Sequence, residues 1–314
     1  MAALPTTYDE PVLLGIIGGT GLYSLDGLTP VARVTISTPW GHPSSPITIS
    51  KTKSGFAIAF LARHGFHHQF TPSDVPAQAN IAALKTLGVR AIIAFSAVGS
   101  LREHIKPRDF ILPSQVIDRT KGIRPSSFFE HGFVGHVGFG DPFDAALAAA
   151  IAAGADVLKA SGSFLHTRET EGGKDLTLVC MEGPAFSTRA ESNLYRSWGA
   201  SVINMSCLPE SKLAKEAEIA YQMVCMSTDY DAWRESEEAV TVETVVGNLK
   251  ANSDNAHRFT LAILEPLEAG LRSGALGKSL EGTMKFAMCT SPAGISAAVR
   301  QKLHFLLPGY WPLE

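Results

Sequence analysis

Cysteine is scarce in this 314-residue chain, which has four such residues and no C-x-x-C pair. The four are scattered along the sequence, at Cys180, Cys207, Cys225 and Cys289. Their spacing offers neither a disulfide framework nor the paired ligands of a structural zinc site. We therefore expect free, buried thiols and a reducing compartment.

Long apolar runs and a strong charge of either sign are also missing. No hydrophobic stretch approaches the ~20 residues of a membrane-spanning helix, and the N-terminus lacks a leader-like pattern. A net charge of −3 gives no sign of a basic surface for nucleic acid or membranes. We expect a cytoplasmic protein, which could also be nuclear, with no nucleic-acid or membrane partner.

Hydrophobic residues, by contrast, make up 45% of the chain, which is ample for a large core. Strand-like apolar runs cover residues 13–18, 47–50, 56–62, 91–97, 110–112, 176–181, 201–205 and 221–227. Helical patterns cover 78–87, 143–152, 187–198 and 242–271, with Ser187 as the cap of the third helix. The polar stretch 166–175 indicates an exposed loop.

This alternation of strands and helices predicts an α/β fold of three layers, α/β/α, around a central mixed, largely parallel sheet. We expect a single domain over residues 1–314, with a helical C-terminal appendage from about residue 283.

The first apolar run ends abruptly in Gly18-Gly19-Thr20-Gly21. Glycine tolerates positive φ and lets a backbone approach a ligand, so these N–H groups could face an anion, with the Thr20 hydroxyl beside them. The segment matches neither the dinucleotide fingerprint nor the P-loop. A tight exit from a strand is the alternative.

Arg63 and His64 directly follow the run 56–62, where α/β enzymes commonly place ligand contacts. A guanidinium can hold phosphate through two parallel hydrogen bonds, although a surface arginine beside a structural histidine fits equally. His67 and His68 extend the cluster but add no carboxylate or thiolate, and Arg63 would repel a cation. We therefore expect no metal site.

Small or polar residues follow three further strands, in the segments 96–97, 205–206 and 228–231. Asp229 and Asp231 are two residues apart, so an extended backbone would point both carboxyl groups to one side, toward one ligand. Apolar surroundings raise a carboxyl pKa and would let one of them hold a proton. A solvated helix cap is the alternative for this pair, and core filling is the alternative for Met205.

Taken in order, these segments resemble the trimeric purine nucleoside phosphorylase family over about residues 12–271. The resemblance rests on residues 15–21, Arg63-His64-Gly65, residues 99–103, Glu182-Gly183-Pro184 with Phe186, residues 204–206 with 209–210, and residues 228–231. It implies a nucleoside phosphorylase-like homotrimer that splits S-methyl-5'-thioadenosine into adenine and 5-methylthioribose 1-phosphate, in purine and methionine salvage. Inorganic phosphate would be the co-substrate, with no cofactor.

The resemblance also implies a role for each site residue. Phosphate would be held by Thr20, Arg63, His64, Ser96, Ala97 and Ser206. The base and ribose would contact Phe186, Ser187, Ile203, Asn204 and Met205, and the catalytic pair Asp229 and Asp231 would bind N7 and the 6-amino group. The 5'-methylthio group would lie against Val242, Val246 and Leu306, with His136 reaching over from a neighbouring subunit.

Substrate choice follows from hydrogen-bond chemistry. Family members that act on 6-oxopurines carry Glu at the position of Ser187 and Asn at that of Asp229. An amide can donate to O6, whereas an ionised carboxylate only accepts and suits a 6-amino group. Three alternatives stay open: a purine nucleoside phosphorylase with a different 5' preference, a nucleosidase that uses water, and a nucleoside-binding protein without turnover.

Overall fold

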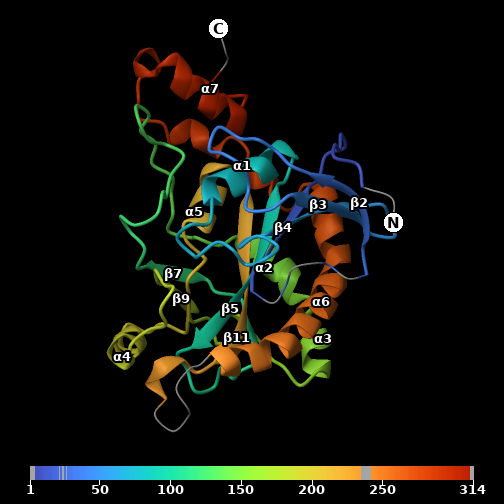
Figure 1. The fold of residues 1–314 in the computed structure, drawn as a ribbon, viewed down its shortest axis with the longest axis vertical. Coiled ribbons are helices and arrows are strands. Elements are labelled where there is room, and N and C mark those ends of the chain that lie inside the picture. The colour runs from blue at the N-terminus through green and yellow to red at the C-terminus, as the bar shows by residue number, and fades with distance from the viewer. Residues whose placement is uncertain (1–3, 21, 23–24, 26, 235–241, 312–314) are drawn as a thin grey trace.

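The computed structural model describes residues 4–20, 22, 25, 27–234 and 242–311, with the backbone alone for residues 242–246. Within this part of the chain, one mixed sheet of eleven strands runs through the molecule (Figure 1). Its strands are β1 (Leu14–Gly18), β2 (Thr29–Val34), β3 (Ile47–Lys51), β4 (Ala57–Ala62), β5 (Ala91–Ser100), β6 (Phe110–Ile111), β7 (Gln115–Asp118), β8 (Leu165–His166), β9 (Thr177–Cys180), β10 (Val202–Asn204) and β11 (Ala220–Asp229).

Strand β5 is the centre of the sheet and has three partners. Along one edge it pairs in parallel with β11, from Ala91 to Gly99. Along the other edge it pairs first with β1, as far as Ala94, and then with the antiparallel strand β10, from Gly99. Strands β1 and β10 therefore point their C-terminal ends at each other across residues 95–98 of β5, which pair with β11 on one edge and with no described strand on this edge.

Helices cover both faces of the sheet (Figure 1). They are α1 (Ala77–Thr86), α2 (Ala145–Ala152), α3 (Ala155–Ala160), α4 (Arg189–Ser197), α5 (Glu210–Glu216), α6 (Val242–Ser273) and α7 (Ala297–Leu306). Alternate residues of β1 enter different cores: Leu14 and Ile16 lie with α2, α3 and α6, whereas Ile17 lies with α1, α5 and α7. The predicted three-layer fold is confirmed.

Several local predictions need correction. The strands β2, β7 and β8 were not expected, because each is short or half polar and shows little apolar periodicity. The cap of α4 is Thr188, not Ser187: its hydroxyl accepts from the Glu191 N–H, and the Glu191 side chain bonds back to Thr188, forming a capping box. His166, expected in an exposed loop, is buried in β8, and Cys289 is an exposed thiol.

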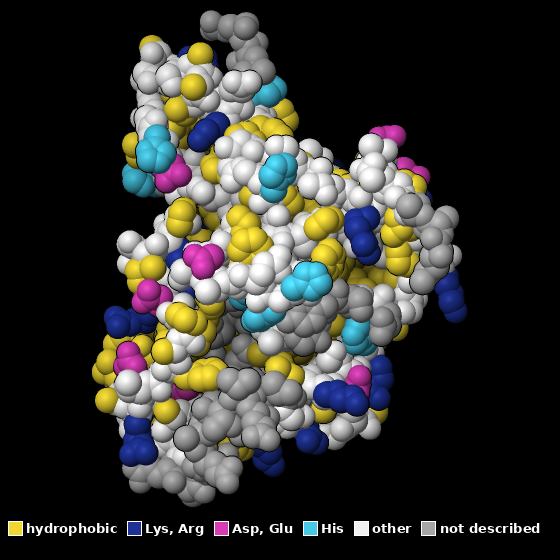
Figure 2. Space-filling view, in the orientation of Figure 1, with side chains coloured by type: hydrophobic (Ala, Val, Ile, Leu, Met, Phe, Trp, Pro, Cys, Tyr) yellow, Lys and Arg dark blue, Asp and Glu magenta, His cyan; other side chains and the backbone are white. Residues whose placement is uncertain are grey.

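The C-terminal segment contains α7, at one end of the long axis in Figure 1 and away from α4 near the other end. Basic and acidic side chains are interspersed on the face drawn in Figure 2. Among the described residues, the search for a helix both long and apolar enough to cross a bilayer found none.

Candidate active site

A pocket of about 460 Å³ opens where β1 and β10 meet beside β5, a volume suited to a small ligand. Sequence-predicted residues that line it are Thr20, Arg63, His64, Ser96, Ala97, Phe186, Ser187, Ile203, Asn204, Met205, Ser206, Asp229 and Asp231. Ser96 and Ala97 lie within β5, and the other residues come from the ends of five further strands or from the loops that follow them. They converge because the C-terminal ends of β1, β4 and β11 lie at the same sheet edge and β10 runs toward it.

Gly18 and Gly19 are required by close approach, not by positive φ. Neither has a left-handed backbone, so of the two properties of glycine considered for this loop only close approach applies to them. A Cβ on Gly18 would lie 2.1 Å from the Leu22 carbonyl oxygen, and one on Gly19 would lie 2.4 Å from the Phe95 carbonyl oxygen. The loop therefore folds against β4 and β5 as only glycine allows, and Thr20 faces the pocket. Gly21 is outside the described residues.

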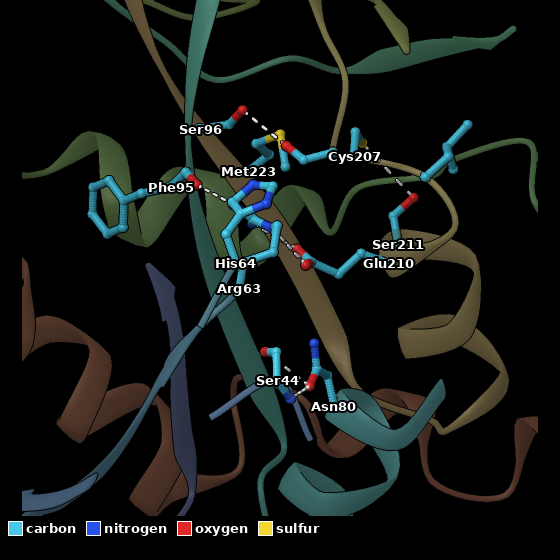
Figure 3. Close-up of polar contacts among 12 residues, drawn as sticks. Ser44, Arg63, His64, Asn80, Phe95, Ser96, Cys207, Glu210, Ser211 and Met223 are labelled. Atoms are coloured by element: carbon cyan, nitrogen blue, oxygen red, sulfur yellow. Dashed lines mark hydrogen bonds and ion pairs between the residues drawn. The ribbon is translucent and has the colours of Figure 1, made fainter. Parts of the chain in front are cut away.

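Arg63 forms the floor of one end of the pocket and is 1% exposed. Its guanidinium donates to both carboxylate oxygens of Glu210, at 2.8 and 3.0 Å, and to the Phe95 carbonyl at 2.7 Å (Figure 3). Burial lowers the pKa of Arg63, but the Glu210 carboxylate offsets this and raises it overall. Three of its five N–H groups are thus committed, which leaves two to donate to an anion.

Glu210 holds this arginine in place. It accepts a further hydrogen bond from the Tyr221 hydroxyl, at 2.6 Å, and is 2% exposed. The motif that contains Glu210 was recognised in the sequence, but its side chain was given no role there. Its partner Arg63 is 147 positions away, so no local pattern could have linked the two.

His64 lies beside Arg63 and is uncharged at neutral pH. Burial, together with the charge of Arg63, lowers the pKa of its imidazole to about 4. Its Nδ1 is 2.9 Å from the Phe70 carbonyl oxygen, which can only accept, so Nδ1 carries the proton. Nε2 is left as an acceptor, which suits the hydroxyl of a monoprotonated phosphate.

Two hydroxyl groups complete this end of the pocket. Ser96 Oγ and Ser206 Oγ lie 3.0 Å apart, and the Asn204 amide donates to Ser96 at 3.1 Å. Ser96 and Ala97 belong to residues 95–98 of β5, where no described strand occupies this edge. Because hydroxyl groups rotate, both serines can turn their O–H toward an oxyanion.

Arg124 is a structural residue of the site that sequence reasoning missed. Its guanidinium donates to the carbonyl oxygens of Met205, Leu208 and Glu182 at 2.8, 2.6 and 2.7 Å. It thereby ties the loop that follows β9 to the loop that follows β10. A lone arginine in a loop carries no sequence signal for such a role.

The middle of the pocket is apolar. Gly183 has a φ of +72°, and a Cβ there would lie 2.4 Å from the Met205 sulfur, so glycine lets these two loops meet. Phe186, 46% exposed, lines the pocket on the same loop, and Ser187 donates to the Met181 sulfur at 3.3 Å. Ile203 lies below, at the end of β10.

Asp229 pairs with Gly99 of β5, four residues beyond the Phe95 carbonyl that Arg63 contacts, so the carboxyl groups lie at the end of the pocket away from Arg63. They do not lie on an extended backbone as we expected. A bulge interrupts β11 before Asp229, and Asp231 opens a 3-10 turn, η1 (Asp231–Trp233), with a φ of 52°. Asp229 Oδ1 accepts from the Asp231 N–H at 2.7 Å, and Oδ2 accepts from the Thr228 hydroxyl at 2.7 Å. The turn, not strand pleating, brings both carboxyl groups to the pocket.

The two carboxyl groups differ in their partners. Asp231 Oδ2 is buried and has no hydrogen-bond partner among the described residues. Burial, reinforced by the charge of Asp229, raises the pKa of Asp231 to about 6. Asp231 can therefore hold or share a proton near neutral pH, as the sequence analysis anticipated for one member of the pair.

Four predicted residues are not placed in this pocket. Leu306 is fully buried in the core that contains α1, α5 and α7, so its side chain faces that core and the expectation for it is corrected. His136 is exposed and does not line the pocket within its own chain. The side chains of Val242 and Val246 are outside the described residues, although Leu249, on the same helix, does line the pocket.

Further lining residues were missed. They are His68, Gln69, Phe70, Thr71, Pro72, Val98, Gly99, Met181, Pro184, Thr228 and Leu249. His68, Gly99, Pro184 and Thr228 belong to motifs that the sequence analysis named without giving these residues a role in the site. Most of the others lie one to eight positions from such a motif, so a wider window around each strand end would have found them.

The chain belongs to the phosphorylase superfamily, whose family model matches residues 13–265. Within it, the chain is 66% identical over 310 residues to S-methyl-5'-thioadenosine phosphorylase of Yarrowia lipolytica, covering 98% of this chain and 96% of the relative.

Solved structures agree with this assignment. The chain is similar to methylthioadenosine phosphorylase from an Antarctic soil metagenomic library, with a TM-score of 0.85, 41% identity and coverage of 96% of this chain and 100% of that one. It is also similar to a variant of adenosine/methylthioadenosine phosphorylase from Schistosoma mansoni in complex with methylthioadenosine. There the TM-score is 0.76, with 28% identity and coverage of 88% and 98%.

Proposed function

We propose that this protein catalyses the phosphorolysis of S-methyl-5'-thioadenosine to adenine and 5-methylthioribose 1-phosphate. The observation that carries the proposal is a single pocket with anion-binding donors at one end and two buried carboxyl groups at the other. The relatives named above, which are called after this substrate, support the choice of nucleoside.

Phosphate binds between Thr20, Arg63 and the serine pair, and its oxygen attacks C1' of the ribose. The C1'–N9 bond breaks through a transition state in which the sugar is cationic, and phosphate stabilises that charge. The electron pair of the broken bond enters the purine. N7 takes up a proton at the Asp229 and Asp231 end, where the raised pKa of Asp231 makes one available.

The hydrogen-bond pattern of the base end favours adenine. Asp229 accepts hydrogen bonds through both of its oxygens, and an ionised carboxylate presents acceptors only. A 6-amino group supplies an N–H donor, whereas a 6-oxo group would face a carboxylate with unfavourable polarity. Phe186 and Met205 provide apolar surface for the base and ribose.

The deciding experiment measures adenine release from S-methyl-5'-thioadenosine with and without inorganic phosphate. We expect release only with phosphate, together with a sugar 1-phosphate visible by phosphorus NMR. Equal release without phosphate, with free methylthioribose as product, would identify a nucleosidase and overturn the proposal. Binding without release at high protein concentration would identify a nucleoside-binding protein.

Adenosine is the second candidate substrate, because the Schistosoma mansoni neighbour is named for both nucleosides. The two differ only in the 5' substituent, so the comparison of kcat/KM for adenosine and S-methyl-5'-thioadenosine measures the 5' pocket directly. We expect kcat/KM to be higher for S-methyl-5'-thioadenosine, because its thioether buries more apolar surface than a 5'-hydroxyl. Burial contributes roughly 0.8 kcal/mol for each methyl-sized group.

The protein acts as a homotrimer in this proposal, with His136 contributing to the site of a neighbouring subunit. Support comes from its exposed position outside the pocket of its own chain. Light scattering tests the oligomeric state, and His136→Ala should raise KM for the nucleoside without changing KM for phosphate.

A cytoplasmic location, with the nucleus as a further one, fits four unpaired cysteines and is tested by cell fractionation.

A further inference from the structure

Two histidines and two carboxylates lie together outside the pocket, at the corner formed by β6 and β8. Parallel pairing of β6 with β8 brings Asp109, which precedes β6, beside His166 in β8. Glu171 follows in the next loop and lies between His166 and His104, with contacts of 2.9 Å to His166 Nδ1 and 3.1 Å to His104 Nε2. Ligand atoms of His104, His166 and Glu171 all lie within 4.8 Å of one another.

We propose that His104, His166 and Glu171 bind a zinc ion, with a water molecule as the fourth ligand. Two imidazoles and one carboxylate form a ligand set that zinc uses in proteins, and nitrogen ligands disfavour magnesium and calcium. Ligands of a tetrahedral zinc at ~2.1 Å lie roughly 3.4 Å apart. The two contacts join different oxygens of Glu171 to the two imidazoles, and one ligand atom from each residue lies within 4.8 Å of the others, so side-chain rotation must close the set around the ion.

The surroundings of His166 match what a metal ligand requires. Its second nitrogen, Nε2, lies 3.1 Å from Asp109 Oδ2, and Asp109 is itself fixed by the backbone N–H groups of Lys106 and Phe164, each at 2.9 Å. A carboxylate on the far nitrogen orients the ring and directs Nδ1 toward the metal. His166 is buried, so this orientation is held by the core and not by solvent.

The other two ligands are partly exposed, so an ion can reach the site from solvent. The His104 side chain is 56% exposed and that of Glu171 is 20% exposed, so an ion and its water can enter from the surface. The Glu171 N–H donates to the Thr167 carbonyl at 3.0 Å, and this hydrogen bond holds the loop that carries Glu171.

Backbone hydrogen bonds connect the segment beside this cluster to the C-terminal end of β11, next to the active-site pocket. The Arg108 N–H donates to the Ser227 carbonyl at 2.8 Å, and the Ser227 N–H donates to the Asp109 carbonyl at 2.9 Å. Zinc would therefore clamp the loop 167–175 onto the segment that supports Thr228 and Asp229. Its role is structural, because none of the three ligands lines the pocket.

The test measures zinc bound per chain, by mass spectrometry of the metal content, after stripping with a chelator, dialysis against zinc in slight excess over the protein, and removal of free zinc. We expect about one zinc per chain in the full-length protein and loss of it in His104→Ala and Glu171→Gln. Both substitutions change solvent-accessible side chains, so folding should be retained. His131→Ala, a highly exposed histidine outside the cluster, and Cys289→Ser, the exposed thiol, should keep the zinc.

Thermal unfolding gives a second readout that is independent of enzymatic activity. Zinc in excess should raise Tm by a few degrees in the parent protein and in the two control variants, and magnesium should not. Equal zinc content in the parent, His104→Ala and Glu171→Gln would overturn the proposal. So would a Tm that zinc leaves unchanged in the parent, since His166 would then be only a hydrogen-bonded partner of Asp109 and Glu171.

Discussion

The two ends of the active-site pocket are built in opposite ways. At the phosphate end, Arg63 is buried and held by Glu210, and the protein supplies hydrogen-bond donors around an uncharged His64. At the base end, Asp231 is buried with one oxygen unpartnered among the described residues and a raised pKa. The buried charge of the phosphate end is paired before any ligand arrives, whereas the base end keeps a carboxyl oxygen that only the ligand can pair.

This contrast has a physical cause. An unpaired guanidinium would be costly to bury, so the phosphate end carries its own counter-charge and keeps two N–H groups in reserve. A carboxyl group can instead become neutral by taking up a proton, so the base end tolerates an incomplete network. Stability and activity should therefore change together at Arg63 and in opposite directions at Asp231.

The largest effect is expected for Arg63→Ala. It removes the anion donors and leaves the Glu210 carboxylate buried without its partner, so kcat/KM for phosphate should fall by ~10³-fold or more and stability by about 3–5 kcal/mol. Steady-state kinetics with each substrate varied in turn, and urea unfolding, measure both. In the double variant Arg63→Met, Glu210→Gln, stability should largely return while activity stays lost; equal losses for phosphate and nucleoside would argue against an anion clamp.

Asp229→Asn should come next and should act on activity much more than on stability. The amide presents donors to a 6-amino group and weakens the acceptor pattern, so kcat/KM for 6-amino nucleosides should fall by ~10²-fold. The matched measurement is turnover of a 6-oxo nucleoside. The ratio of its kcat/KM to that of the 6-amino nucleoside should be higher in the variant than in the parent protein. Unchanged adenine release in this variant would falsify the assignment of Asp229.

Asp231→Asn should lower activity but raise stability at neutral pH. Because the pKa rises from 3.8 to about 6 on folding, ionisation of Asp231 opposes folding above pH 6 and has no such effect below pH 4. Asparagine removes that penalty, up to about 3 kcal/mol at pH 7.5, and tolerates the positive φ. The Tm of Asp231→Asn should therefore rise increasingly above that of the parent protein between pH 4 and pH 8. A Tm difference that does not change with pH would contradict a raised pKa.

The smallest effect is expected for Thr188→Ala, at the cap of α4 that directly follows the pocket residues Phe186 and Ser187 in the chain. Loss of the capping box should cost about 1 kcal/mol of stability. KM for the nucleoside should rise by no more than ~3-fold, with KM for phosphate unchanged. A larger change in KM for phosphate would mean that α4 couples the two ends of the pocket, so that they would not be independent.

Much of the site follows from local sequence patterns, as particular residues show. Arg63, Ser96 and Asp229 each come at or near the end of an apolar run, and the C-terminal ends of parallel strands share one edge of a sheet. The alternation of strands and helices fixed the three-layer fold for the same reason, because period and termination are local properties of a chain.

Only the tertiary structure decided which distant groups meet. The Glu210 partner of Arg63, the carbonyl oxygens around Arg124, and the position of Leu306 in the core depend on contacts between segments far apart in the chain. The pKa of Asp231 and the pairing of His166 with Asp109 depend in the same way on burial. Desolvation and long-range hydrogen bonds exist only after the sheet has assembled, so no pattern of neighbouring residues could have specified them.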